Sequence, residues 1–359
     1  MSRCDLEHDN FHAALDWVIG TGDADWAFRL GLALYAFWER REHLVEGRQR
    51  LEAIVNLEGA KALADRWAHS LSYIAALGGL SGDPETGRQL HETGLATFRV
   101  LGNRKGEALA LNALGSYLGF KGEYAAARAY YEQAVAVCRA IGSQPEIAAA
   151  LSNLAGVVSH GGDRDRACAL LEEAHAIFEM LGDRVAATWT VNHRGDVARR
   201  HNDGAEARRL YQRAVERFTS LGDLWGIARS SADLAYVACD EGDHAAAHDL
   251  FAGALLALER LDHKRGIARV FDGFAYLAQR EGKSDRALTL AAAAAAVRRT
   301  FGAPARPADE AVLEQSLHGA RNAYDRATAE AIWTAGQRLP LEDAITLALD
   351  RPASVTTRS

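Results

Sequence analysis

Apolar residues recur at helical spacing along most of the chain, and short polar stops interrupt them at regular intervals. Leu111, Leu114 and Leu118 fall on one face of a helix that ends near residue 120. After the stop, Ala127 and Tyr131 begin a second apolar face with the same spacing. The pattern predicts pairs of amphipathic helices joined by tight turns.

The stops form two interleaved series, each with a step of 40 residues. The first series is Leu101-Gly102, Ile141-Gly142, Leu181-Gly182, Leu221-Gly222 and a worn copy at Leu261-Asp262. The second series is Gly82-Asp83, Gly122-Glu123, Gly162-Asp163, Asn202-Asp203, Gly242-Asp243 and Gly282-Lys283. Two series with one period predict a repeated helix–turn–helix unit.

The residues at the stops have the properties of helix caps. Glycine tolerates the left-handed backbone that closes a helix, and asparagine shares that tolerance. We therefore expect C-terminal caps at Gly102, Gly122, Gly142, Gly162, Gly182 and Asn202. The residues that follow carry oxygens that accept hydrogen bonds from free N–H groups, which predicts N-terminal caps at Asn103, Ser143, Asp183 and Asp223.

The unit that starts at Leu111 resembles the tetratricopeptide repeat. It has the letters L-x2-L-G-x2-L followed by Ala127, Tyr131 and Ala134, beside the family pattern W-x2-L-G-x2-Y…A-x3-F…A. The 40-residue step is longer than the usual 34 and also occurs in HEAT and armadillo arrays. Recurrent small residues favour the tetratricopeptide interpretation: Gly115, Ala155, Gly195, Ala235 and Ala275 in the first helices, and Ala127, Ala167, Ala207, Ala247 and Ala287 in the second. The expected fold class is all-α, a right-handed α-solenoid of tetratricopeptide-like repeats with a 40-residue period.

The ends of the chain depart from the 40-residue step. We expect an N-terminal helical junction segment at 1–64, repeats at 65–301, a C-terminal helical cap at 302–351 and a disordered tail at 352–359. The repeats comprise five clear units and a degenerate copy at 65–101. The sequence of the junction segment predicts three helices and a packed aromatic cluster, since large aromatic rings bury much surface area. Its aromatic residues are Trp17, Trp26, Phe28, Phe37 and Trp38.

Both ends also resemble one class of bacterial regulator. Glu7 through Trp17 has the letters E-x-D-N-x-x-A-A-L-x-W, and "FWERREHLVEGRQRLE" follows it; near the far end stand "AAAAAAVRRTFGAPARPADEAVLEQSLHGARNAY" and "IWTAGQRLPLEDAITLAL". The first two of these segments resemble the link between the nucleotide-switch and repeat regions of STAND-class transcriptional regulators, and the last two resemble their closing cap. Such regulators carry an effector domain and an NB-ARC-type ATPase before a tetratricopeptide sensor arm. The resemblance implies a regulatory arm, with an ATPase and a DNA-binding domain upstream or in a partner chain.

A nucleotide switch is not expected in this chain. The only fragment of a phosphate-binding loop is Gly282-Lys283-Ser284, and the earlier glycine that the motif requires falls at Leu277. The fragment is interpreted as a helix–helix turn. The sequence therefore predicts the arm without the switch, as a separately encoded protein or a fragment.

Histidine pairs are the remaining candidates for chemistry. His244 and His248 are spaced i, i+4 and hold zinc only if a third ligand joins them, which leaves a metal-dependent hydrolase as a remote alternative. No HExxH signature is present, so a solvated outer helix face is favoured. His8 and His12 share the spacing, and the junction pattern accounts for their segment without a metal. We expect no catalytic residues, no metal and no cofactor.

The composition of the chain limits the classes of binding partner and the cellular location that we expect. The net charge of −7 gives no overall basic field for a nucleic-acid backbone. The four cysteines form no CxxC, and the N-terminus lacks the apolar core of a signal peptide. The longest uncharged run, from Ala287 to Val297, is too short to span a membrane. These features predict a cytoplasmic protein with reduced thiols, no direct nucleic-acid contact and no membrane contact.

Function is therefore expected on a surface. In tetratricopeptide proteins the first helices line a concave groove, and the resemblance projects Asn112, Ser116, Phe120, Ser152 and His160 onto its first half. The second half is the better candidate: Asn192, Asp196, Arg199, Arg200, Arg229, Tyr236, Asp240, Arg269, Asp272, Tyr276 and Arg280.

Arginine and tyrosine together suit the recognition of a protein, a peptide or a small acidic ligand. The alternative is a solvated face whose charges pair among themselves, as Arg269 and Asp272 would on one helix. The predicted function is a non-enzymatic interaction or sensing module, with a free-standing adaptor as the second hypothesis.

Overall fold

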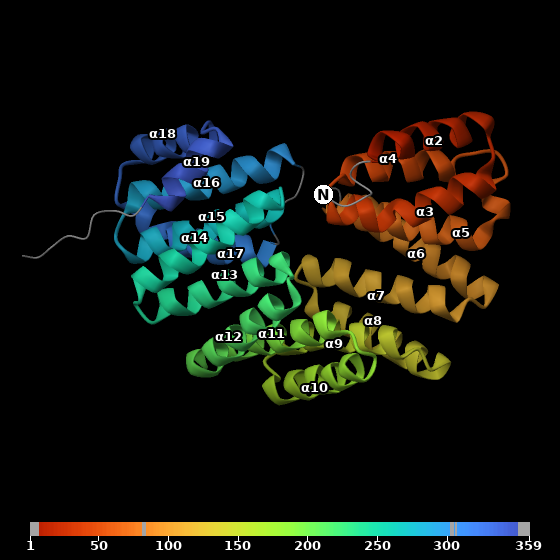
Figure 1. Cartoon of the computed structure of the whole chain (residues 1–359), viewed down its shortest axis with the longest axis horizontal. Coiled ribbons are helices and arrows are strands. Elements are labelled where there is room, and N and C mark those ends of the chain that lie inside the picture. Colours follow the sequence, from red (N-terminus) through yellow and green to blue (C-terminus); the bar gives the residue numbers. More distant parts are fainter. Residues whose placement is uncertain (1–6, 81–83, 302–304, 306, 351–359) are drawn as a thin grey trace, which may run out of the picture. The chain divides into compact units, whose positions relative to one another are not determined.

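The structure, a computed structural model, describes residues 7–80, 84–301, 305 and 307–350. Regular structure in these ranges is entirely helical, with eighteen α-helices, one short 3₁₀ helix and no strand (Figure 1). No helix of the described ranges has both the length and the apolar character that crossing a membrane requires. The expected stop at Gly82-Asp83, the tail at 352–359 and Cys4 lie outside the described residues.

The chain divides into two compact units at Gly182, and each is described by itself. The first unit contains α2 (His8–Thr21), α3 (Ala24–Arg40), α4 (Leu44–Val55), η1 (Ala60–Ala62), α5 (Ala64–Leu80), α6 (Pro84–Leu101), α7 (Arg104–Phe120), α8 (Tyr124–Ile141), α9 (Gln144–His160) and α10 (Arg164–Met180). The second contains α11 (Arg184–Arg200), α12 (Gly204–Leu221), α13 (Leu224–Asp240), α14 (His244–Arg260), α15 (Lys264–Arg280), α16 (Ser284–Thr300), α17 (Pro307–Asn322), α18 (Arg326–Gln337) and α19 (Leu341–Leu349).

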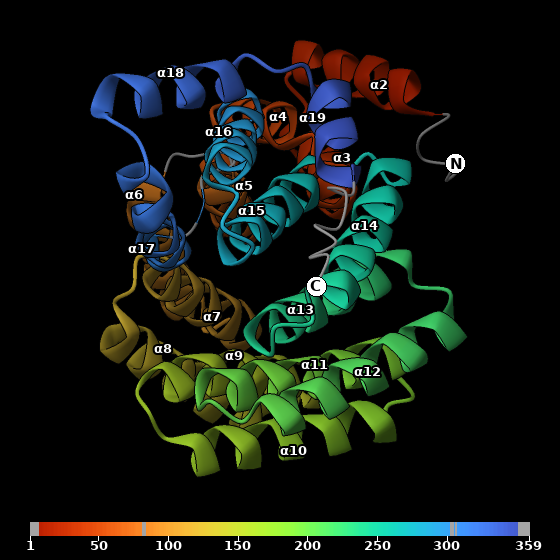
Figure 2. The ribbon, with the colours of Figure 1, turned by 90° about the vertical axis from the view of Figure 1, so that its left-hand side faces the viewer.

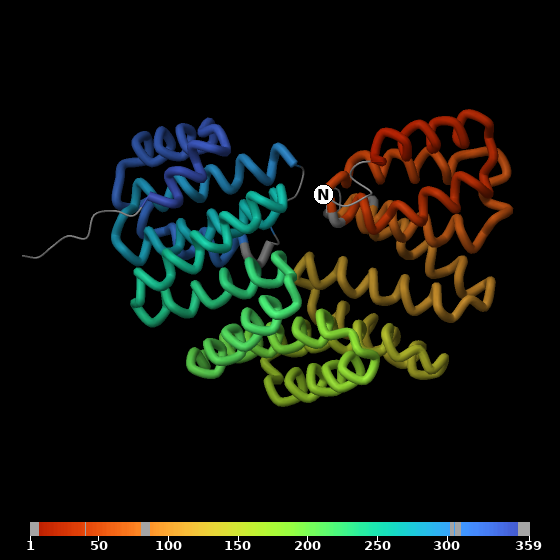
Figure 3. The backbone as a smooth tube through the Cα atoms, viewed as in Figure 1, coloured from red at the N-terminus to blue at the C-terminus, as the bar shows by residue number. Residues whose placement is uncertain are grey.

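Within each unit, helices that follow one another in sequence pack together across short turns (Figure 3). First helices of successive pairs also touch, as α5 touches α7 and α13 touches both α11 and α15. The degenerate copy forms a helix pair too, α5 with α6. In the second unit α15 lies beside α13 and α16, and the last helices close the end of the row, because α17 packs on α15 and α16, α18 on α16, and α19 on α14 and α16 (Figure 2).

The predicted C-terminal caps are confirmed by the backbone. All five capping glycines have positive φ angles, and Asn202 adopts the same left-handed conformation with φ 59°. The N-terminal caps are confirmed at Asn103, Asp183 and Asp223, whose side chains accept hydrogen bonds from backbone N–H groups three residues on. Ser143 is the exception: its hydroxyl donates to the Glu146 carboxylate and caps no backbone group. The hydroxyl of Ser143 is therefore bound to an acidic side chain of the first turn and not to the backbone N–H that was expected.

The predicted small positions are confirmed as close contacts between paired helices. All ten are buried. A Cβ added to Gly115 would lie 2.7 Å from a ring carbon of Tyr131, and one added to Gly195 would lie 2.6 Å from a ring carbon of Tyr211. The missing side chain at each glycine thus makes room for a tyrosine of the next helix.

The aromatic cluster of the N-terminal segment is smaller than expected. Phe28 and Trp38 are fully buried in a core that α2, α3, α4 and α5 share, and Phe37 packs against it. Trp17 and Trp26 are exposed, so the prediction that they join the packed junction is wrong. Both lie on the outer face of their amphipathic helices. The prediction counted aromatic residues without assigning them to a helix face, so it did not detect this.

Candidate functional site

Side chains of three first helices meet on one face of the second unit. On α13, Arg229, Asp233, Tyr236 and Asp240 follow one another at steps of four, three and four residues. This spacing places them on one side of a helix. Because α13 touches both α11 and α15, these side chains reach partners on either side.

Asp233 is the centre of the first network and was missed by the sequence analysis. Only 3% of its side chain is exposed. Its Oδ2 accepts hydrogen bonds from Arg229 Nε at 2.9 Å and from Asn192 Nδ2 at 3.2 Å, and its Oδ1 accepts one from Arg269 Nη2 at 2.6 Å. Ser230 Oγ completes the set by donating to Asn192 Oδ1 at 2.6 Å.

The two arginines decide the charge state of Asp233. Burial by itself raises the pKa of the carboxyl group. The charges of Arg229 and Arg269, and the hydrogen bonds to the carboxylate, outweigh burial and hold the pKa of Asp233 well below its usual range. Asp233 is therefore a carboxylate at neutral pH and fixes the positions of both guanidinium groups.

Asp240 is the centre of the second network, two helical turns further along α13. Its Oδ1 accepts hydrogen bonds from Tyr276 OH at 2.6 Å and from Arg280 Nη2 at 3.1 Å, and its Oδ2 lies 3.5 Å from Arg199 Nε. Burial, followed by the hydrogen bond to Asp240, raises the pKa of Tyr276, so its hydroxyl remains a donor. One carboxylate thereby joins α11, α13 and α15.

The predicted neighbours Tyr236 and Tyr276 do lie together. Their ring centroids are 5.6 Å apart, and the Arg199 guanidinium lies 4.8 Å from the centroid of Tyr236. Such a contact between a cation and an aromatic face is attractive. The structure therefore brings together Arg199, Tyr236, Asp240, Tyr276 and Arg280, of which Tyr236 and Tyr276 occupy equivalent repeat positions.

The remaining predicted residues have other surroundings. Asp196 accepts a hydrogen bond from Tyr211 OH of α12 at 2.8 Å, and Arg200 is exposed at the end of α11. Ser116 and Tyr131 of the first unit repeat the relationship of Asp196 and Tyr211, with 2.9 Å between their hydroxyl oxygens.

One expectation about this face is wrong. Asn192 is fully buried and donates a hydrogen bond to Asp233, so it does not face a groove. Asp272 accepts two hydrogen bonds from Arg298 of α16, and Arg269 donates to Asp233 of α13. Each of these two charged residues therefore binds a partner on a neighbouring helix.

A pocket of about 220 Å³ opens beside the Asp233 network, between α13, the end of α14 and the start of α15. Its polar and aromatic lining consists of Trp225, Arg229, His263, Arg265 and Arg269, and its apolar lining comes from Ala228, Ala232, Leu258, Gly266 and Val270. Trp225 Nε1 donates to His263 Nε2 at 2.9 Å across the rim. The lining contains arginines and no carboxylate, since Asp233 lies behind it.

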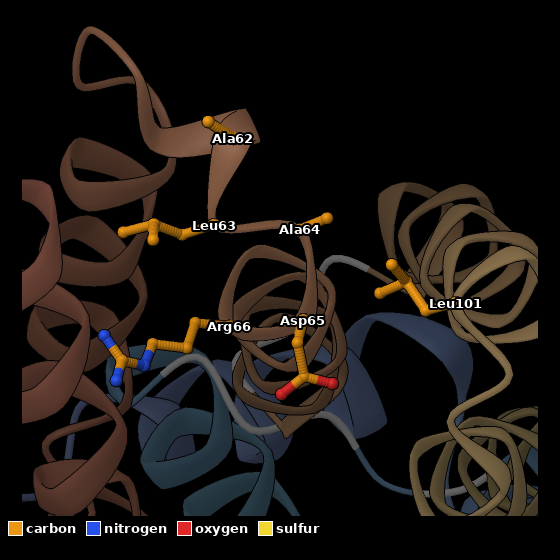
Figure 4. A pocket seen from close by; sticks show the side chains of 6 residues that line it. All are labelled: Ala62, Leu63, Ala64, Asp65, Arg66 and Leu101. Carbon is orange, nitrogen blue, oxygen red and sulfur yellow. The ribbon is translucent and has the colours of Figure 1, made fainter.

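Another pocket, of about 340 Å³, lies in the first unit at the start of α5 (Figure 4). Leu63 and Arg66 extend to one side of it and Leu101 lies on the other, with Asp65 between them. Asp65 accepts a hydrogen bond from Asn103, and Arg66 pairs with Asp25. The two charged residues of this pocket, Asp65 and Arg66, therefore connect neighbouring helices.

The structure also shows the surroundings of the histidine pair and of the phosphate-loop fragment that the sequence analysis considered. His248 is buried, with its ring 5.5 Å from that of Phe274, so the expectation of a solvated face is wrong at this position. Within the described residues His244 and His248 belong to no group of three metal-ligating side chains, although an Asp249 carboxylate oxygen lies 3.9 Å from His248 Nδ1. Lys283 is the residue before α16 and follows the positive-φ turn at Gly282, and its Nζ lies 2.9 Å from a carboxylate oxygen of Glu281.

Solved structures with a similar fold share little sequence with the chain. A Rap protein complexed with competence and sporulation factor is 11% identical, with a TM-score of 0.60 over 95% of this chain and 99% of that one. The Rap conjugation gene regulator of plasmid pLS20, in complex with the Phr* peptide, is 16% identical, with a TM-score of 0.60 over 79% and 76%. A STAND protein with a tetratricopeptide repeat sensor from Pyrococcus horikoshii is 13% identical, with a TM-score of 0.57 over 92% of this chain and 52% of that one. The chain thus spans about half the length of the STAND protein.

Family comparison agrees with the helix pairs. No curated protein sequence matches the chain. The family model named tetratricopeptide repeat matches residues 66–140 and 146–220, the first match beginning in the degenerate copy. The chain therefore contains tetratricopeptide repeats.

Proposed function

We propose that the chain is a non-enzymatic sensing or interaction module that binds an acidic peptide or a small acidic ligand at the pocket between α13 and α15. The observation that carries the proposal is the lining: Arg229, Arg265 and Arg269 surround a hollow of about 220 Å³ beside Trp225. Guanidinium groups bind carboxylates with matched geometry, and an indole supplies rigid contact area.

The Asp233 network prepares this pocket for an anion. Arg229 donates to Asp233 through Nε, and that bond uses one of the five N–H donors of the guanidinium. Holding the arginine side chains in place before binding lowers the conformational entropy that a ligand must overcome. Three guanidinium groups line the pocket, and Asp233 binds two of them, in a chain whose net charge is −7.

The resemblance and the fold both support a regulatory role. We propose a right-handed solenoid with a 40-residue period over 65–301, with a junction at 1–64 and a cap at 302–351, acting in the cytoplasm as the sensor arm of a STAND-type transcriptional regulator. Support comes from the similar fold of a Rap protein complexed with competence and sporulation factor and of a STAND protein with a tetratricopeptide repeat sensor. In this role, ligand binding would release an ATPase switch carried upstream or by a partner chain.

A free-standing adaptor is the second candidate function. It is supported by the exposed Arg200 and Arg280, which lie at the ends of α11 and α15 and extend the charged face beyond the pocket. An adaptor of this kind would bind an acidic partner protein across several helices. The two functions differ in whether a short peptide is sufficient for binding.

The test is a binding assay with short acidic peptides, in forms with a free C-terminal carboxylate and in amidated forms, measured by fluorescence anisotropy. Arg265→Ala should weaken binding about 10-fold or more, because a charge-assisted hydrogen bond contributes roughly 1.5–3 kcal/mol. Arg209→Ala is the matched control, since Arg209 lies on α12 and pairs with Glu206 away from the pocket. Equal affinity in the wild type and the Arg265 variant would refute the site.

A further inference from the structure

A group of metal-ligating side chains lies in the first unit, far in sequence from the face described above. His8 begins α2, His43 caps the start of α4, and Glu46 is in the first turn of α4. Their ligand atoms all lie within 4.8 Å of one another, and they are the one such group of three or more that the described residues contain. The spacing of His8 and His12 points to only one of these three residues, because His43 and Glu46 follow His8 by 35 and 38 residues.

The donor atoms are already close to the separations of a coordination sphere. Glu46 Oε2 lies 3.2 Å from His8 Nε2 and 3.9 Å from His43 Nδ1. Tetrahedral zinc with bonds of about 2.0–2.1 Å places its ligand atoms about 3.3 Å apart. His43 must therefore move closer to Glu46 to complete the set, since 3.9 Å exceeds this separation.

The other carboxylate oxygen of Glu46 is held by neighbouring donors. Trp38 Nε1 donates to Oε1 at 3.2 Å, and His12 Nε2 lies 3.0 Å from the same oxygen. Arg50 Nη2 lies 2.9 Å from His12 Nδ1, and arginine has donors only, so His12 accepts there and carries its proton on Nε2. Trp38 therefore donates to Oε1, and the proton on His12 Nε2 lies between Oε1 and His8 Nε2, which is 3.1 Å from it. The other oxygen, Oε2, faces the imidazoles of His8 and His43.

We propose that His8, His43 and Glu46 bind a zinc ion, with His12 and Trp38 as positioning residues. Two imidazole nitrogens and one carboxylate oxygen are ligands that suit zinc, whereas calcium and magnesium prefer oxygen ligands alone. Hydrogen bonds from outer groups to a ligating carboxylate are the usual support of such sites. Three protein ligands leave one position for water or an anion.

The ion would link α2, the first described helix, to α4. α2 touches α3 and α4, and its buried contacts come from Leu15 and Val18 in the middle of the helix. His8 lies at the start of α2, where the ring of Phe37 is 5.3 Å away and that of His43 4.5 Å away. A bond through zinc would stabilise this end of α2, because a ligand that binds only the folded form stabilises it.

The experiment is a calorimetric titration of the untagged, chelator-treated full chain with zinc chloride. The wild type should bind one ion per chain, and His8→Ala, His43→Ala and Glu46→Gln should each lose stoichiometric binding. His12→Ala should weaken the affinity by about 10- to 100-fold, as removal of a positioning group does. His175→Ala is the matched control: its side chain is 26% exposed against 25% for His8, and its Nε2 lies 3.7 Å from a Glu179 carboxylate oxygen one turn away.

Two further measurements keep the result decisive. Helical circular dichroism without metal shows whether each variant folds, and cobalt substitution gives the visible absorption of a tetrahedral site in the wild type and the His175 variant. A wild type that binds no ion overturns the proposal. Binding that survives equally in the His8, His43 and Glu46 variants also overturns it, since the ion would then lie at other residues.

Discussion

Arg269 Nη2 of α15 donates a 2.6 Å hydrogen bond to Asp233 Oδ1 of α13, across 36 residues of sequence. The other oxygen of the same carboxylate is held by Arg229 at 2.9 Å. Because Asp233 is nearly inaccessible to water, its charge is compensated by these groups and not by solvent. Stability and the geometry of the pocket therefore depend on one side chain.

Replacing Asp233 should lower the stability of the fold strongly, and replacing Asp240 should lower it only slightly. Asp233→Ala removes the partner of two guanidinium groups at a buried position and should lower the free energy of unfolding by about 3–5 kcal/mol. Asp240→Ala is the control, because 38% of the Asp240 side chain is exposed and pairs of that kind contribute about 1 kcal/mol or less. Urea denaturation followed by circular dichroism measures both, and equal losses would contradict the difference in burial.

Acid should destabilise the first unit through His91 of α6. Burial lowers the pKa of His91 from 6.5 to about 4. Between these values the unfolded chain binds a proton that the folded chain does not, so the contribution of His91 to stability is full above pH 6.5 and is lost as the pH falls toward 4. The slope should reach about 1.4 kcal/mol per pH unit.

His91→Leu provides the check on this slope. The variant keeps a buried apolar group of similar size and has no proton to bind. The free energy of unfolding, measured by urea titration at several values between pH 7 and pH 4, should depend less on pH than in the wild type. An unchanged slope would show that other groups cause the acid dependence.

The glycine contact between α11 and α12 should not accept a methyl group. Gly195→Ala places a Cβ 2.6 Å from the ring of Tyr211 and should lower the free energy of unfolding by about 1–3 kcal/mol. Gly253→Ala of α14 is the matched control, since an added Cβ there meets no atom within 4 Å. That control should stabilise the helix by roughly 0.5–1 kcal/mol, so thermal melts should shift in opposite directions.

Two helix caps that look alike in sequence should differ in their effect. Asp183 accepts a hydrogen bond from Ala186 N at 2.9 Å, so Asp183→Ala should lower the free energy of unfolding by about 1 kcal/mol. Ser143 caps no backbone group, so Ser143→Ala should have a smaller effect. A larger loss at Ser143 than at Asp183, in the same denaturation assay, would contradict the observed hydrogen bonds.

Much of the fold follows from local rules that the sequence displays. The left-handed turns at Gly102 and Asn202 and the small residues at Gly115 and Gly195 were all predicted, because each depends on near neighbours or on the repeat step. The exposed Trp26 was not predicted, since packing of an aromatic residue depends on which face of its helix meets the core.

The candidate site was predicted only in part. Tyr236, Asp240 and Tyr276 were found because equivalent repeat positions lie side by side. Asp233 was missed because the projected groove residues Asn192 and Asp272 of the neighbouring repeats correspond to position 232, one residue before it. A single residue decides which side of a helix faces its neighbour. Its position four residues after Arg229 was the available signal. The cluster of His8, His43 and Glu46 joins segments of different helices, and no local spacing reveals such a contact.

The bonds of Asp240 also limit how this part of the chain can change length during evolution. Repeat arrays gain and lose whole units readily when each unit makes similar contacts with the next. Deleting the 40 residues from Leu224 to His263 would move Arg280 into the place of Asp240, opposite Arg199, and Gly273 into the place of Asp233. Two like charges would then meet and Asn192 would lose its acceptor, so a unit cannot be cut out of this stretch without compensating substitutions.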